Sequence, residues 1–85
     1  MWYVYVTQSL KSGIHYVGMS QDVAQRIKHH NVGKSKFTRG HTPWQLIYQE
    51  EVGSTTEARK REKYLKSAAG ERSLTKLLNG GSLPG

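Results

Sequence analysis

The sequence contains no cysteine, few acidic residues and no long hydrophobic run. Without cysteine the chain can form neither a disulfide framework nor a thiolate zinc site. No apolar stretch approaches the roughly 18 residues that cross a bilayer, so a transmembrane helix is excluded and we expect no membrane partner. Residues 1–6 lack the basic start and the longer apolar segment of a signal peptide, from which we expect a cytoplasmic protein.

The scarcity of acids leaves a large excess of positive charge. Thirteen lysines and arginines stand against six aspartates and glutamates, which gives a formal net charge of +7 at pH 7. A balance of this kind predicts a polyanionic partner, with nucleic acid ranked before an acidic membrane surface. At 85 residues and 35% hydrophobic content, the chain suits one small domain with a modest core.

Hydrophobic patterns predict an α+β domain with a small antiparallel sheet, in the order β-β-α-β-α-α. The expected elements are strands at residues 2–7, 14–19 and 44–51 and helices at residues 22–30, 54–69 and 71–78. Trp44, Leu46 and Tyr48 should share one face of the third strand, and Gly70 should end the second helix. Residues 31–43 form a long loop, which in so small a domain is typical of function or mobility. We expect one domain over residues 1–78 and a flexible tail over residues 79–85.

The second predicted helix carries a carboxylate on its apolar side. Ala58, Leu65 and Ala69 form its only continuous apolar face, and Glu62 interrupts it. Burying this carboxylate unpaired would cost several kcal/mol. A cationic group must therefore meet it, either an arginine such as Arg26 or a metal ion, and a structural ion pair is the ordinary explanation.

Packing alone is also a sufficient explanation for two other features of the sequence. Arg26 and His30 border the buried stripe of the first helix, where an arginine can extend past the core edge and a histidine can be half-buried. Tyr5 and Tyr16 lie on the same side of the sheet if the hairpin pairs residues whose numbers sum to 21 or 23, as cross-strand aromatic pairs commonly do. Gly18 would leave room there for a ligand or another backbone.

The cations concentrate in two regions, the loop beside Phe37 and the helix that contains Glu62. The members that we expect to contact phosphates are Lys34, Lys36, Arg39, Arg59, Lys60, Arg61 and Lys63. A charged helix face is usually just a solvated one. Because few acids dilute these cations, the pattern favours a phosphate-contacting surface.

The spacing of these residues resembles that of the GIY-YIG nuclease superfamily. Tyr3-Val4-Tyr5 precedes Tyr16-Val17-Gly18, Arg26 follows Tyr16 by ten residues, and Glu62 lies on a later helix. The resemblance runs over residues 2–78. It is nearest to the small single-domain bacterial members and also extends to the nuclease domain of the excision-repair incision subunit. The first motif begins with a tyrosine where the family name has glycine, which we expect to alter packing more than chemistry.

The resemblance implies a three-stranded antiparallel sheet flanked by helices, and a nuclease that hydrolyses DNA phosphodiester bonds with Mg²⁺ or Mn²⁺. The residues that it implies for the site are Tyr5, Tyr16, Arg26, His30 and Glu62. Glu62 would be the metal ligand and Arg26 would bind phosphate oxygens. Tyr16 ranks before Tyr5 as the general base, which requires a nearby cation to lower its pKa. Asn79 is a weaker candidate for a late asparagine that some relatives use.

Two alternatives remain at this level: a non-catalytic nucleic-acid-binding module on the same scaffold, and an RNA-directed nuclease. A pure binder would need neither the tyrosine pair nor Glu62 on an apolar face. Many relatives with known targets carry further domains that supply specificity. We therefore expect low sequence specificity, a preference among single-stranded, duplex and branched DNA that the sequence leaves open, or dependence on a protein partner. The resemblance to the incision subunit implies a place in DNA repair.

Overall fold

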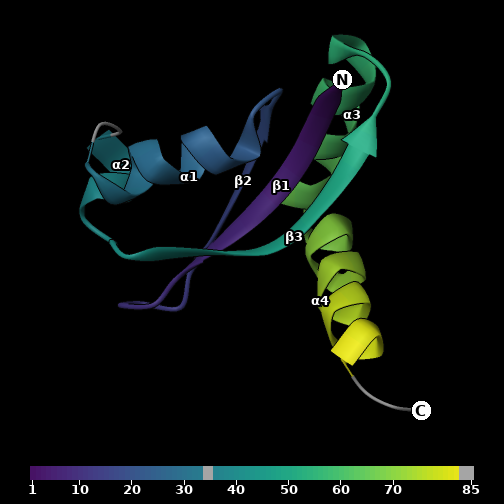
Figure 1. The fold of residues 1–85 in the computed structure, drawn as a ribbon. Helices are drawn as coiled ribbons and strands as arrows, with labels where there is room; N and C mark the ends of the chain where they lie inside the picture. Colours follow the sequence, from purple (N-terminus) through teal and green to yellow (C-terminus); the bar gives the residue numbers. More distant parts are fainter. Residues whose placement is uncertain (34–35, 83–85) are drawn as a thin grey trace.

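A computed structural model describes residues 1–33 and 36–82, and within these it describes no side chain for residue 37 or for residues 77–82. A three-stranded antiparallel sheet lies between two groups of helices (Figure 1). The strands are β1 (Trp2–Ser9), β2 (His15–Ser20) and β3 (Trp44–Val52), in the order β2-β1-β3. The helices are α1 (Val23–Asn31), α2 (Lys36–Arg39), α3 (Thr55–Lys66) and α4 (Ala68–Ser82). The predicted α+β fold is confirmed, with α2 as a short addition inside the predicted loop.

The central strand β1 sends alternate side chains to opposite faces of the sheet. Val4 and Val6 are fully buried toward α3 and α4, where Leu65 and Leu74 complete a hydrophobic cluster. We call this side of the sheet the apolar face. Tyr5 and Thr7 must point to the other side because successive strand residues alternate. We call this second side, which meets α1 and α2, the tyrosine face.

The β1–β2 hairpin places both motif tyrosines on the tyrosine face. Tyr5 is paired with Gly18, and Thr7 with Tyr16, so the paired numbers sum to 23. This sum meets the condition stated for a shared face, and the two tyrosines are diagonal neighbours. The sheet therefore holds two phenols side by side on the face that α1 covers.

The strand β3 contains an irregularity that the sequence pattern did not predict. Val6 is paired with Tyr48, but Thr7 is paired with Leu46, so one extra residue is accommodated between them. Trp44 therefore shares the tyrosine face with Leu46, whereas Tyr48 packs against the apolar cluster. The expectation that Trp44, Leu46 and Tyr48 lie on one face is wrong because the bulge reverses the alternation.

The second predicted helix is divided in two. Ser54 caps α3 by accepting the Glu57 backbone N–H, but α3 ends at Lys66 and α4 begins at Ala68. Gly70 lies inside α4, where a Cβ would overlap the carbonyl oxygen of Tyr64. This glycine permits close approach of the two helices and does not end a helix as we expected.

The last helix is longer than predicted at both ends. The α4 helix runs from Ala68 to Ser82, so the first part of the segment expected as a flexible tail is helical. Within the described part of the chain, no helix combines the length and the apolar character that a membrane span needs.

Candidate active site

The centre of the candidate site is a buried histidine between two tyrosines. The Tyr5 hydroxyl lies 3.0 Å from Nε2 of His30, and the ring of Tyr16 meets the His30 ring edge-on with centroids 4.9 Å apart. Asp22 caps α1 by accepting the Gln25 N–H, which fixes where this helix begins. His30, in the last turn of α1, consequently faces the two phenols of the hairpin.

The loop after α1 holds the other side of His30. Nδ1 of His30 lies 3.0 Å from Oγ1 of Thr38, a fully buried residue of α2. The indole Nε1–H of Trp44 donates to the Thr38 carbonyl oxygen at 2.7 Å. Thr38 and Trp44 were not among the site residues predicted from the sequence. A buried imidazole needs a partner for each ring nitrogen, which is the signal that points to a hydroxyl in the neighbouring loop.

Burial sets the protonation states of Tyr5 and His30 at neutral pH. It raises the pKa of Tyr5 to about 12, to which the nearby Tyr16 phenol also contributes. Burial, followed by the positive charge of Arg26, lowers the pKa of His30. Tyr5 is therefore a phenol and His30 a neutral imidazole at pH 7. A neutral imidazole has one donor and one acceptor, so the hydroxyls of Tyr5 and Thr38 play opposite hydrogen-bonding roles.

Arg26 lies at the exposed edge of this cluster. It precedes His30 by one turn of α1 and its side chain is open to solvent. Its charge opposes the effect of burial on the Tyr5 pKa and adds to the lowering of the His30 pKa. The guanidinium is thus close enough to act on both rings while remaining accessible to an anion.

Glu62 approaches the same cluster from α3. Its side chain is 25% exposed, between the buried Ala58 and Leu65, and its negative charge raises the pKa of Tyr5. The ion pair that the structure shows is with Lys66, at 3.9 Å and with the lysine 53% exposed. This long, exposed pair leaves the carboxylate accessible.

The donor set at Glu62 fits a hard divalent cation. In the described residues no three His, Asp or Glu side chains gather at a common point, so Glu62 offers one carboxylate there. Mg²⁺ commonly binds through one or two carboxylates and keeps several waters that a phosphate oxygen can replace.

The packing around Gly18 explains why a glycine ends the second motif. A Cβ at this position would lie 2.5 Å from the Tyr5 hydroxyl oxygen and 2.6 Å from Cζ. The space that we expected for a ligand or another backbone is therefore filled by the Tyr5 ring. Because β2 has no side chain here, this phenol can lie across the strand and reach His30.

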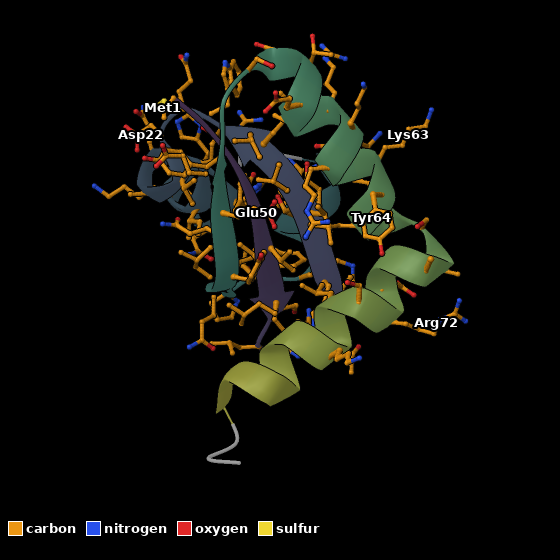
Figure 2. All side chains as sticks on the ribbon, turned by 90° about the vertical axis from the view of Figure 1, so that its right-hand side faces the viewer. Met1, Asp22, Glu50, Lys63, Tyr64 and Arg72 are labelled. Carbon is orange, nitrogen blue, oxygen red and sulfur yellow. The ribbon has the colours of Figure 1, made fainter. Side chains whose placement is uncertain are left out.

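Most of the predicted phosphate-contacting cations are open to solvent. Those with exposed side chains are Lys36, Arg39, Arg59, Lys60 and Lys63. Figure 2 shows Lys63 extending outward from α3, and Arg72 doing the same from α4. Lys34 lies outside the described residues, as does the side chain of Asn79.

Arg61 differs from the other cations of α3. Its Nε donates to Oε2 of Glu50 at 2.8 Å, while the Tyr48 hydroxyl donates to Oε1 of the same carboxylate at 2.6 Å. Its guanidinium also lies 5.3 Å from the ring centroid of Tyr64. Arg61 therefore joins α3 to β3 and is held by the fold, unlike the other predicted cations of this helix.

Comparison with known proteins agrees with this fold. Residues 1–75 match the family model of the GIY-YIG catalytic domain. The chain belongs to this nuclease family, and the resemblance noted from the sequence is confirmed.

The chain is similar to several small UPF0213 proteins. A UPF0213 protein of Staphylococcus saprophyticus is 38% identical over 80 residues, which cover 93% of this chain and 95% of that protein. One of Halobacterium salinarum is 40% identical over 67 residues, covering 78% and 86% of the two chains. The solution NMR structure of the UPF0213 protein BH0048 of Bacillus halodurans is 37% identical and covers 91% of this chain and 85% of that one, with a TM-score of 0.54.

Proposed function

We propose that the chain is a divalent-metal-dependent endonuclease that hydrolyses DNA phosphodiester bonds with low sequence specificity. One observation carries the proposal. The Tyr5 hydroxyl is bonded to His30 and experiences the charges of both Arg26 and Glu62, and His30 is in turn packed against Tyr16. Two phenols and an imidazole from β1, β2 and α1 thus lie together within electrostatic reach of a guanidinium on α1 and a carboxylate on α3, an arrangement that suits hydrolysis of a phosphate diester.

Arg26 is the proposed phosphate-binding group. Its planar donors can engage two phosphate oxygens and stabilise the charge that develops on them. Its exposed position leaves it free to meet a DNA strand, while its proximity to Tyr5 and His30 brings the bound phosphate beside them.

Tyr16 is the proposed general base. It would take a proton from the water that attacks phosphorus, and the departing 3′ oxygen would take up a proton from solvent. Tyr5 is less suited to this role because burial raises its pKa to about 12. It instead holds the neutral His30 in place, together with Thr38.

Glu62 is the proposed ligand of Mg²⁺ or Mn²⁺. A cation there would neutralise charge on the phosphate and the leaving oxygen. The exposed cations of α2 and α3 would position the strand through its phosphates, which accounts for low sequence specificity.

The test compares nicking of labelled single-stranded, duplex and branched DNA in Mg²⁺, Mn²⁺ and EDTA. We expect Glu62→Gln to abolish metal-dependent nicking while DNA affinity measured by fluorescence anisotropy changes little. The matched control is Glu51→Gln, the same change at an exposed position of β3, which should leave nicking intact. Loss of nicking and affinity together, or of neither, would show that Glu62 is a structural residue.

A further inference from the structure

A cleft of about 400 Å³ opens between β2 and the junction of α3 and α4. Its floor is apolar, formed by the buried side chains of Val17, Leu65 and Leu74. Its polar lining comes from His15, Lys66 and Glu71. None of these six residues has a role in the proposed reaction, and the volume falls in the range typical of small-ligand sites.

Two residues connect the cleft to the candidate active site. Tyr16 lines the cleft and also packs its ring against His30. Lys66 lines it too, and its ammonium lies 3.9 Å from the Glu62 carboxylate. The proposed base and the ion-pair partner of the proposed metal ligand thus line the cleft, so a group in the cleft would lie near the phosphate being cut.

We propose that this cleft binds one unpaired nucleobase of the DNA strand, adjacent to the scissile phosphate. This inference rests on the proposed function and names its substrate class. An apolar floor suits the faces of a base, Lys66 and Glu71 can pair with its polar edge, and the cationic Lys66 favours the phosphates on either side. In a duplex every base is stacked and paired, and extracting one costs a few kcal/mol. Single strands and unpaired junctions are therefore the favoured substrates.

The direct test uses NMR of the intact protein in EDTA, where no metal-dependent cleavage occurs. Backbone amides are followed during titration with pentathymidylate and with a pentamer of abasic sites, which has the same phosphates and no bases. We expect pentathymidylate alone to shift the amides of residues 15–17 and 65–74, while both oligomers shift the exposed part of α3 around Lys63. Equal shifts with both oligomers, or no shift in the cleft, would overturn the inference.

A pair of variants sharpens the test. Glu71→Phe fills the mouth of the cleft, and Glu51→Phe makes the same change on β3, at the other edge of the sheet. Both glutamates are exposed, so folding should be retained. Glu71→Phe should weaken pentathymidylate binding about tenfold, the scale of one base contact. Glu51→Phe should not, and equal weakening in both would contradict a base site in the cleft.

These measurements separate the base site from the proposed function. If wild-type protein nicks DNA but the cleft amides do not respond to bases, the base site is wrong and the nuclease stands. If the cleft amides respond but no metal supports nicking of any DNA, the base site stands and the proposed reaction is wrong.

Discussion

The two faces of the sheet are equally buried but are held by different forces. Along β1, Val4 and Val6 on the apolar face and Tyr5 and Thr7 on the tyrosine face are all 0% exposed. The apolar face meets Leu65 and other hydrophobic side chains through dispersion and the hydrophobic effect. The tyrosine face meets a histidine and a threonine through directed hydrogen bonds.

The difference shows where a small domain can keep chemistry without losing its core. Buried polar groups are costly unless each has a partner. Among the described side chains, no buried nitrogen or oxygen lacks one. The chain of contacts from Tyr5 through His30 and Thr38 to Trp44 meets this condition, so the tyrosine face can be dry, rigid and chemically competent together.

The largest effect on stability should come from the apolar face. Leu65→Ala removes a fully buried side chain from the cluster and should lower the free energy of unfolding by about 2–5 kcal/mol. Tyr5→Phe removes only one hydroxyl from the tyrosine face and should cost about 1–3 kcal/mol. Urea unfolding measures both. A larger cost for Tyr5→Phe than for Leu65→Ala would contradict this ranking of the two faces.

A large effect on activity, without a matching effect on stability, should come from the edge of the tyrosine face. Arg26→Ala removes the proposed phosphate-binding guanidinium and should lower the nicking rate about 10²-fold or more. Its exposure predicts little change in unfolding. Lys28→Ala, which removes an exposed cation from the same helix, is the control and should alter the rate only slightly. A variant of Arg26 that unfolds easily and nicks normally would reverse this assignment.

A smaller effect, on both stability and activity, should follow from crowding the tyrosine face. In Gly18→Ala the new methyl group overlaps the buried Tyr5 phenol, which cannot swing aside, so we expect a loss of about 1–3 kcal/mol. Nicking should fall because Tyr5 is displaced from His30. Gly40→Ala is the matched control, since a Cβ added there would meet nothing within 4 Å. Thermal unfolding and nicking assays would contradict the packing argument if both variants behaved alike.

Local rules predicted much of this architecture. The predicted helix starts at residues 22 and 54 agree with the caps, since the side chains of Asp22 and Ser54 each accept a backbone N–H of the first turn. The alternation of β1 predicted its two faces, whereas the sequence left the parity of the hairpin open, and the structure shows the odd sum that puts Tyr5 and Tyr16 on one face. These features depend on residues near one another in sequence, whose geometry the strand and helix periods fix.

Features that depend on distant residues were not predictable in this way. The bulge in β3 reverses the face of Tyr48, which then joins Glu50 and Arg61 in one polar group. The contact of Thr38 with His30 requires a turn of helix in a segment with no periodicity. In each case tertiary packing selects one of several local conformations that the sequence pattern allows equally.

The smallest expected effect is a pH dependence that belongs to the tyrosine face alone. Burial and the charge of Arg26 lower the pKa of His30 in the folded protein, so the unfolded chain takes up its proton first, near pH 6.5. The contribution of neutral His30 to the free energy of unfolding is therefore present above pH 6.5. It is lost as the pH falls toward the pKa of His30 in the folded protein, by at most about 1.4 kcal/mol per pH unit. Urea unfolding from pH 7.5 to 5 should show this slope, and His30→Gln should remove it. Arg26→Ala should raise the His30 pKa, measured by NMR, and so narrow the pH range over which the folded and unfolded chains differ in His30 protonation. An unchanged slope in His30→Gln would mean that the acid sensitivity arises outside the tyrosine face.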